Sequence, residues 1–327
     1  MRIVSRVTCS ILTLLVSLPL VAHAAARDQL VLVVNRAPQV LSVFKADGPT
    51  LTLVKKVPIP KGSREISVSP DGNRAYVSSL EENSVTVVDL NTLAVVATIT
   101  DPSLLTVDGG VVSADSKMFY VTSAGKDLVV VIDAATNKVI KTIPTGSAAP
   151  RRLIISPDGK RMFVGHNKSD LIGVIDLAAG KTVKHIKVGN ECRGGFGFSP
   201  DGKTLLNNSV EDDTLYFIDL ATDTVKKIIG VPFSPQRIEM TPKGFAVVLS
   251  GGIGRAVTIM EHLEHHDANS TVRVGNAAWG LALNADATFA FASNYKDGTL
   301  SIVDLVNKTL VQHMPVGEDP NGVAFRK

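Results

Sequence analysis

A short repeat runs along the chain and constrains its fold more strongly than any other feature. The segment Ser69-Pro70-Asp71-Gly72 recurs at 156–159 and 199–202, and degenerate copies begin at 113, 241 and 284, so that successive starts are 44, 43, 43, 42 and 43 residues apart. Twenty residues after each start stands an acidic residue: Asp89, Asp133, Asp176, Asp219, Glu261 and Asp304. Two markers in one register indicate that a single structural unit is repeated.

Each repeat divides into four short runs rich in β-branched and aromatic residues, separated by Gly, Pro, Asn and Asp. In the third copy these runs span residues 152–156, 161–165, 171–176 and 181–187. Such a pattern predicts four antiparallel strands, which is typical of a β-propeller blade. The Ser-Pro-Asp-Gly segments are then hairpin turns, because Pro presets the turn and Gly accepts a positive φ. The recurring acidic residues are interpreted as turn caps.

The two ends of the chain together supply one further blade. Residues 32–35 match the second strand of a repeat and residues 40–45 the third, while the missing first strand reappears at 316–325. Six complete repeats and one split repeat predict an all-β, seven-bladed β-propeller with four antiparallel strands per blade. The C-terminal strand joins the N-terminal blade and closes the ring, which removes the free sheet edges of an open array. We therefore expect one propeller domain over residues 25–327.

The first 24 residues are organised as a secretory signal peptide. Arg2 and Arg6 form a basic start, an apolar run spans residues 7–21, and Ala22-His23-Ala24 offers a cleavage site. We expect this segment to be removed and the remaining protein to be periplasmic or secreted, with no membrane span.

Cysteine content and charge narrow the remaining possibilities. After cleavage only Cys192 is left, so no intrachain disulfide forms and burial must stabilise the fold. Loss of Arg2 and Arg6 reduces the 34 basic residues to 32 against 31 acidic ones, a formal charge of +1. This near-neutrality argues against a strongly cationic nucleic-acid binder.

A second segment recurs seven residues after each repeat start. It reads Tyr76-Val77-Ser78-Ser79, Tyr120-Val121-Thr122-Ser123, Phe163-Val164-Gly165-His166 and Phe291-Ala292-Ser293-Asn294, with weaker copies at Leu206 and Val248. On these segments the chain resembles the YVTN-repeat β-propeller family of exported bacterial proteins, over essentially all of residues 25–327. The resemblance implies the propeller fold. It implies no single activity, because related repeats occur in surface-layer and periplasmic proteins and resemble the propeller parts of some redox enzymes.

Four repeats carry arginine where the chain enters the innermost strand: Arg64, Arg151 or Arg152, Arg193 and Arg237. Propeller strand order places these loops on one face together with the loops that join second and third strands. We therefore expect the arginines around the mouth of the central channel, where clustered guanidinium groups favour a carboxylate or phosphate. Pairing of these arginines with acids between blades is the alternative interpretation.

Other residues at related positions extend this candidate site. Glu65 and Asp108 are expected to neutralise part of the arginine charge, and Trp279 is a stacking surface or a packing residue. His166 and Tyr295 are placed on adjoining loops. The candidate ligand-binding residues are Arg64, Glu65, Asp108, Arg152, His166, Arg193, Arg237, Trp279, Tyr295 and Asn321.

A second irregularity is rich in histidine. Residues 261–267 hold His262, His265 and His266, half of the six histidines outside the signal segment. Imidazole and carboxylate groups together bind Zn²⁺ or Cu²⁺, which makes these histidines candidate metal ligands. The repeat register places them in a hairpin on the face opposite the arginines, and no closed ligand spacing is present, so an exposed His-rich turn is the competing interpretation.

Three functions fit these residues. The preferred one is an exported non-catalytic propeller that binds an anionic small molecule, a polyanion or a periplasmic partner protein on its arginine-bearing face. The alternative is a lactonase-like hydrolase or a redox-accessory enzyme subunit, with a divalent cation held at the channel mouth by Glu65, Asp108, Asn321 or His166. The third is a scaffold whose rim docks a partner. Covalent-haem, P-loop, Rossmann and nucleophile-elbow motifs are missing, so the sequence requires no cofactor.

Overall fold

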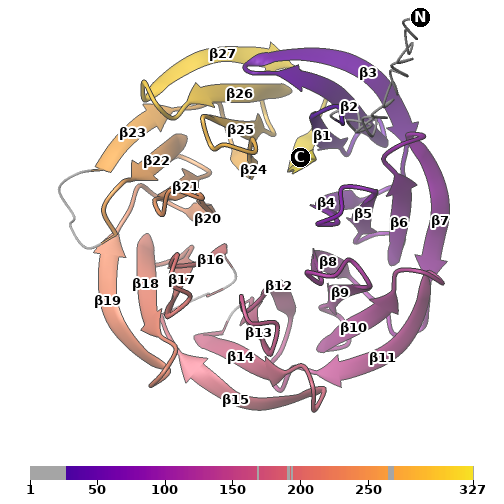
Figure 1. Ribbon diagram of the computed structural model, residues 1–327, viewed down its shortest axis with the longest axis vertical. Coiled ribbons are helices and arrows are strands. Elements are labelled where there is room, and N and C mark those ends of the chain that lie inside the picture. The colour runs from indigo at the N-terminus through magenta and orange to yellow at the C-terminus, as the bar shows by residue number, and fades with distance from the viewer. Residues whose placement is uncertain (1–26, 168, 190–191, 193, 264–268, 327) are drawn as a thin grey trace, which may run out of the picture.

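The computed structural model describes residues 27–167, 169–189, 192, 194–263 and 269–326. These residues form seven four-stranded sheets, arranged as blades around a common axis (Figure 1). The predicted all-β, seven-bladed propeller is therefore confirmed. No helix in the described part of the chain is long and apolar enough to cross a membrane. The predicted signal segment, residues 1–24, lies outside the described residues.

Each blade is an antiparallel sheet whose strands follow one another from the centre of the ring to its rim (Figure 1). Blade 1 consists of β28 (Pro320–Arg326), β1 (Leu30–Asn35), β2 (Val40–Asp47) and β3 (Thr50–Pro58); blade 2 of β4 (Ser63–Val68), β5 (Arg74–Ser79), β6 (Ser84–Asp89) and β7 (Ala94–Thr100); blade 3 of β8 (Val107–Val112), β9 (Met118–Ser123), β10 (Leu128–Asp133) and β11 (Lys138–Pro144); blade 4 of β12 (Pro150–Ile155), β13 (Arg161–His166), β14 (Leu171–Asp176) and β15 (Lys181–Lys187). Blade 5 consists of β16 (Phe196–Phe198), β17 (Thr204–Ser209), β18 (Thr214–Asp219) and β19 (Thr224–Gly230); blade 6 of β20 (Pro235–Met240), β21 (Ala246–Ser250), β22 (Ala256–Met260) and β23 (Asn269–Arg273); blade 7 of β24 (Ala278–Leu283), β25 (Phe289–Asn294), β26 (Thr299–Asp304) and β27 (Thr309–Pro315).

Blade 1 joins the two ends of the chain. β28 pairs antiparallel with β1, with Leu32 opposite Ala324 and Asn35 opposite Pro320. It also packs between β24 and β4, the innermost strands of the two neighbouring blades. The last strand therefore lies beside the axis of the ring (Figure 1), which confirms the predicted closure.

Burial follows the position of a strand within its blade. All six residues of β1 are buried, whereas β3, on the rim, is mostly exposed. Inner strands pack against neighbouring blades through their faces, as where Tyr76 of blade 2 stacks on Phe119 of blade 3 with ring centroids 4.4 Å apart. Strands covered on both faces require apolar residues at successive positions, which explains the apolar runs within each repeat.

The Ser-Pro-Asp-Gly segments form the predicted turns. The Gly72 N–H donates to the Ser69 carbonyl at 2.8 Å, and the Ser69 hydroxyl donates to Asp71 at 2.5 Å. Gly72 has a φ of +68°, a conformation that glycine adopts freely. The acidic markers cap the next turn: Asp89 accepts the Thr92 N–H at 2.8 Å, and this bond is the main cause that lowers the pKa of Asp89.

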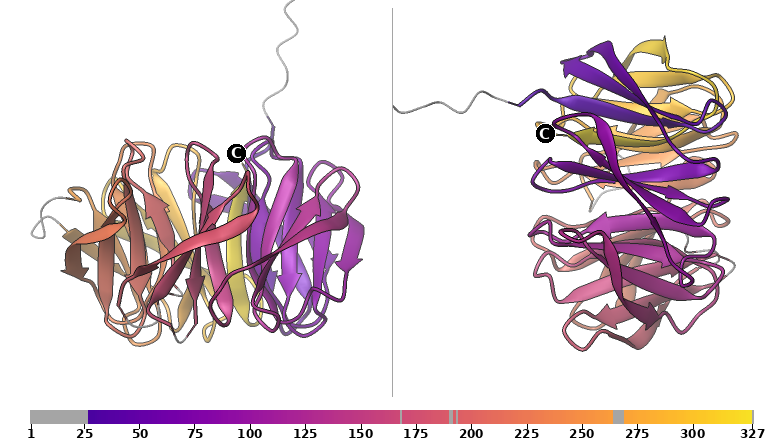
Figure 2. Two further views of the ribbon diagram at one scale, coloured as in Figure 1. Left: turned by 90° about the horizontal axis from the view of Figure 1, so that it is seen from below. Right: turned by 90° about the vertical axis from the view of Figure 1, so that its right-hand side faces the viewer.

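The loops divide between two faces of the ring (Figure 2). Loops that join second and third strands hydrogen-bond to loops that enter innermost strands, as the Leu80 N–H does to the Gly62 carbonyl at 3.1 Å and the Tyr295 N–H to the Ala277 carbonyl at 3.2 Å. These two sets of loops share one face, as predicted, and we call it the arginine face. The Ser-Pro-Asp-Gly turns connect the opposite ends of the strands.

Candidate functional site

The candidate side chains lie at the start of the innermost strands, where a backbone irregularity recurs around the ring. The pairing with the second strand shifts register between Ser63 and Glu65, Val107 and Gly110, Pro150 and Arg152, Pro235 and Arg237, and Ala278 and Leu281. A residue with positive φ precedes these strands, such as Ala149 at +53° and Ser234 at +57°. A β-bulge leaves an extra residue unpaired and re-aims its side chain. Consecutive residues can therefore both reach the mouth of the channel.

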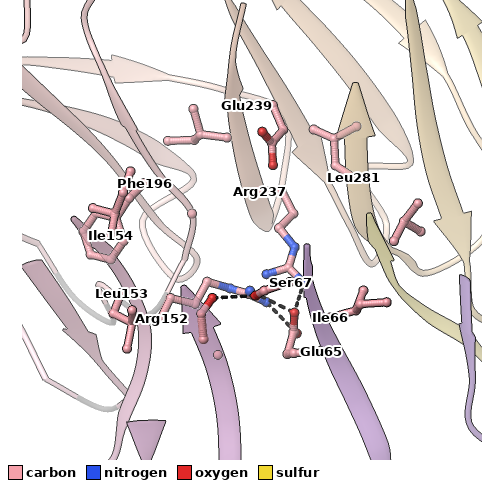
Figure 3. Close-up of a pocket in the computed structure, with 15 residues that line it drawn as sticks. Glu65, Ile66, Ser67, Arg152, Leu153, Ile154, Phe196, Arg237, Glu239 and Leu281 are labelled. Carbon is pink, nitrogen blue, oxygen red and sulfur yellow. Dashed lines mark hydrogen bonds and ion pairs between the residues drawn. The ribbon is translucent and has the colours of Figure 1, made fainter. Parts of the chain in front are cut away.

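Glu65 occupies the centre of the site. The residue is 6% exposed, and its carboxylate accepts two hydrogen bonds from Arg152 at 3.0 and 3.2 Å and one from Arg237 (Figure 3). The indole N–H of Trp279 donates to the same carboxylate at 3.4 Å. These four residues, which we call the Glu65 hub, belong to blades 2, 4, 6 and 7. The hub thus ties together blades that are distant in sequence and, for the most part, do not adjoin.

Asp108 forms a second ion-paired group. Arg151 Nε lies 2.8 Å from its carboxylate and Arg64 Nη1 lies 3.9 Å from it. The two guanidinium groups also lie over the ring of Trp279, at 4.4 Å for Arg64 and 5.5 Å for Arg151. Burial lowers the pKa of Arg64, and the neighbouring guanidinium groups act in the same direction while the carboxylates oppose it. Since arginine stays charged in proteins, Arg64 lies where water is scarce and where neighbouring guanidinium groups partly offset the two carboxylates.

Several polar atoms of this region are buried without a hydrogen-bond partner among the described residues: Arg64 Nε, Arg151 Nη2, Asp108 Oδ1 and Asn321 Oδ1. Buried polar groups in proteins are nearly always satisfied, so open donors and acceptors gathered in one place indicate a site for another molecule. Within the described part of the chain, the four arginines here form ion pairs with two carboxylates, and a third carboxylate, Glu239, also lines the channel. The resulting excess of positive charge suits an anion.

Two hollows adjoin these residues. The channel cavity, about 210 Å³ in volume, has polar walls formed by Glu65, Ser67, Arg152, Arg237 and Glu239 (Figure 3). The mouth pocket, about 350 Å³, is lined by Arg36, Arg64, Ser234, Gln236, Gly252, Ala277, Ala278, Trp279, Tyr295 and Asn321. Three hub residues therefore face the channel cavity and the fourth, Trp279, faces the mouth pocket.

The structure corrects the position of His166. This residue ends β13 and is fully buried, whereas the sequence placed it on a loop, because the strand extends one residue beyond the predicted run. Its Nδ1 lies 3.0 Å from the Leu171 carbonyl oxygen and its ring lies 6.4 Å from that of His185. Burial lowers the pKa of His166. It lines neither the channel cavity nor the mouth pocket.

The other sequence candidates divide between those brought together and those outside the described residues. Tyr295, directly after β25, and Asn321, in β28, meet in the mouth pocket. Arg151 and Arg152, which the sequence offered as alternatives, both contribute, one to Asp108 and the other to Glu65. Arg193 lies outside the described residues.

Sequence reasoning missed Arg36, which lies in the loop between β1 and β2 and lines the mouth pocket. Only residues that open innermost strands were considered as sources of arginine. The sequence did contain a signal for Arg36: loops that join second and third strands were predicted to lie on the arginine face, and Arg36 is in such a loop. Gln236 was missed for a different reason, since no sequence pattern distinguishes it as a binding residue although it is adjacent to Arg237.

The histidine-rich segment is only partly described. His262 is exposed after β22, and His265 and His266 lie outside the described residues. In the part of the chain that the structure describes, no group of three or more His, Cys, Asp or Glu residues is placed to hold a metal ion. Cys192 is buried, and burial raises its pKa to about 11, so its thiol stays protonated near neutral pH.

Comparison with known proteins identifies the family of this chain. A family model described as "Lactonase, 7-bladed beta-propeller" matches residues 22–190, just over half of the chain. The chain belongs to this lactonase propeller family. No curated protein matches it.

Two solved structures show the same fold as this lactonase-family propeller. A chain of Kuenenia stuttgartiensis hydrazine synthase superposes with a TM-score of 0.71 and 24% identity, over 80% of this chain and 89% of the other. A functionally unknown protein from Desulfotomaculum acetoxidans superposes with a TM-score of 0.77 and 16% identity, over 90% of this chain and 98% of the other. At 24% and 16% identity, the similarity to these two structures shows the fold and not the function.

Proposed function

We propose that this protein is a non-catalytic binding protein that holds a small anionic molecule on its arginine face. The observation that carries the proposal is the pair of buried guanidinium atoms, Arg64 Nε and Arg151 Nη2, that have no partner among the described residues. Both belong to the cluster of arginines and carboxylates at the mouth of the channel, in which positive charge exceeds negative charge among the described residues. A polyanion or a partner protein would meet the same face, but the mouth pocket, at about 350 Å³, is sized for a small molecule.

The state of the two carboxylates supports binding over bond-making chemistry. Glu65 accepts hydrogen bonds from Arg152, Arg237 and Trp279. Asp108 is paired with Arg151 and Arg64. Both carboxylates therefore act as fixed counter-ions that position guanidinium donors, and such preorganised donors bind an anion without a large reorganisation.

Fluorescence of Trp279 offers a direct test, because it is the only tryptophan in the chain and lines the mouth pocket. Inorganic phosphate and acetate are titrated at constant ionic strength. We expect saturable changes in Trp279 emission, weakened roughly tenfold or more in Arg64→Gln, since hydrogen bonds to charged groups contribute about 1.5–3 kcal/mol. Lys55→Gln, which removes the same charge from the exposed rim strand β3, is the matched control and should bind like the wild type. Wild-type protein that responds to neither anion contradicts the proposal.

The family match favours a second candidate, a lactonase-like hydrolase. In this alternative Glu65, Asp108 and Asn321 would hold a divalent cation, which would supply polarisation of a carbonyl group. Arg152 and Arg237 would have to release Glu65 first. Hydrolysis of a panel of lactones, measured with and without added Mg²⁺, Ca²⁺ or Mn²⁺, separates the two functions. Metal-dependent turnover that is lost in Asp108→Asn supports the hydrolase, and its absence across the panel counts against it.

We further propose that the protein is exported and that residues 1–24 are removed as a signal peptide. The support is the sequence pattern of that segment. N-terminal sequencing of the protein from its native host should begin at Ala25, and a retained Met1 contradicts export by this route. The YVTN-repeat interpretation of the recurring four-residue segments likewise stays a proposal beside the family match.

A further inference from the structure

The mouth pocket has two kinds of wall, and together they describe a ligand. One wall is cationic, formed by Arg36 and Arg64. The other is largely apolar, formed by the rings of Trp279 and Tyr295 with small side chains between them. A simple inorganic anion would need only the cationic wall, so the apolar wall indicates a ligand that also has an apolar part.

The cationic wall is where positive charge remains open. Arg152 and Arg237 are engaged by Glu65, and Arg151 donates to Asp108 at 2.8 Å. Arg64 lies 3.9 Å from the Asp108 carboxylate, and Arg36 lies 3.9 Å from Glu81. The Nε atoms of Arg36 and Arg64 are both buried without a partner among the described residues. Of the described arginines at the mouth, these two have the longest ion-pair distances.

The aromatic wall is fixed in place by the hub. The Trp279 N–H donates to Glu65, which is itself held by Arg152 and Arg237. The guanidinium of Arg64 lies 4.4 Å from the centroid of the Trp279 ring. A flat apolar group in this pocket would thus meet Tyr295 and the part of the preoriented Trp279 ring that Arg64 does not cover.

A third contact comes from the strand that closes the ring. Asn321 in β28 is 3% exposed, and its Oδ1 is buried without a partner in the described part of the chain. Its backbone carbonyl accepts the Ser293 hydroxyl at 2.5 Å, which anchors the residue. A carboxylate cannot satisfy an acceptor, so the amide oxygen calls for a hydroxyl or N–H donor on the ligand.

We propose that the mouth pocket recognises an aromatic carboxylate, preferably one with a hydroxyl substituent. Its carboxylate binds Arg64 and Arg36, its ring lies against Trp279 and Tyr295, and its hydroxyl donates to Asn321. This inference rests on the proposed anion-binding function and specifies the ligand class of that site. It adds to simple charge recognition a requirement for a flat apolar body.

Calorimetric titrations with acetate, inorganic phosphate, benzoate, 4-hydroxybenzoate and benzyl alcohol test it. Benzoate should bind roughly tenfold or more tightly than acetate, because its ring removes apolar surface from water. 4-Hydroxybenzoate should bind more tightly still, and Asn321→Ala should reduce its affinity to that of benzoate. Benzyl alcohol, which keeps the ring but lacks the charge, should bind at least tenfold more weakly than benzoate. Trp279 emission, excited where benzoate does not absorb, should report the same benzoate affinity.

Variants separate the two walls. Arg64→Gln should weaken the binding of every anion, whereas Tyr295→Leu, which leaves the hub intact, should weaken the binding of the aromatic acids more strongly than that of acetate. Lys55→Gln should alter none of them. If acetate and phosphate bind in an Arg64-dependent manner but benzoate binds no more tightly, the ligand class is wrong and the anion-binding function stands. If no anion binds, both are wrong, and benzoate binding that survives Arg64→Gln places the site elsewhere and overturns this inference.

Discussion

Replacing Glu65 with Gln is expected to destabilise the whole ring. The substitution preserves the shape of the side chain but removes the only carboxylate that Arg152 and Arg237 share in the described structure. The side chains of these two arginines are 12% and 10% exposed. Removing one partner of a buried ion pair costs about 3–5 kcal/mol, because the remaining charge stays buried without compensation. The Gln amide oxygen still accepts one hydrogen bond, so we expect a loss near the lower end, about 3 kcal/mol.

Thermal and urea denaturation measure this loss. At about 2–4 °C per kcal/mol, the Tm of Glu65→Gln should fall by roughly 6–12 °C. Glu81→Gln is the matched control: it removes an equivalent charge that is 45% exposed and lies 3.0 Å from Lys61, and exposed pairs contribute no more than about 1 kcal/mol. Equal, small losses in the two variants would refute the buried-hub argument.

A double-mutant cycle sharpens the test. Arg237→Gln combined with Glu65→Gln should lose less stability than the sum of the single losses, because the second substitution removes a charge that the first left uncompensated. Glu65→Gln and Arg64→Gln should also differ in their effect on anion binding. Glu65→Gln increases the local positive charge and should bind acetate at least as tightly as the wild type, opposite to the effect expected of Arg64→Gln.

Three further predictions concern other parts of the molecule. Deletion of residues 321–327 removes most of β28 and should lower the stability of the entire ring in a melting experiment; unchanged melting is incompatible with ring closure by that strand. Burial lowers the pKa of His166 in the folded state. The contribution of His166 to stability is therefore fully present above its unfolded pKa of about 6.5. This contribution is lost as the pH falls from that value through the lower folded pKa, because the unfolded state binds the proton first. Stability should therefore decline as the pH falls below about 6.5 in the wild type and less steeply in His166→Asn, with equal slopes counting against this assignment. The buried thiol of Cys192, with a pKa raised to about 11, should resist thiol reagents in folded protein and react after unfolding; rapid reaction of the native protein would show that it is accessible.

The sequence predicted the fold well because a propeller repeats one unit under one set of constraints. The turn residues, the capping aspartates and the split of blade 1 between the chain ends are all visible as periodic spacing. The described arginines, Arg64, Arg151, Arg152 and Arg237, lie on the predicted face for the same reason, since strand order alone determines on which face a loop lies.

The sequence could not predict which side chains form ion pairs across the ring. Glu65 binds Arg152 and Arg237, which lie 87 and 172 residues away in sequence. Whether such side chains meet depends on the length of each one and on which residue of each recurring β-bulge turns toward the channel, and the spacing of the repeats shows neither. The error at His166 has a local cause, because moving the end of one strand by a single residue takes a side chain from a loop to the interior.

The central claim is that this lactonase-family propeller holds a small anion at the mouth pocket through Arg64. Native mass spectrometry of the protein, purified gently from its own compartment, tests it most directly. We predict a small organic acid bound to the wild-type and Lys55→Gln proteins and missing from Arg64→Gln. A mass equal to that of the bare chain in all three, or an adduct that Arg64→Gln retains at full occupancy, contradicts the claim.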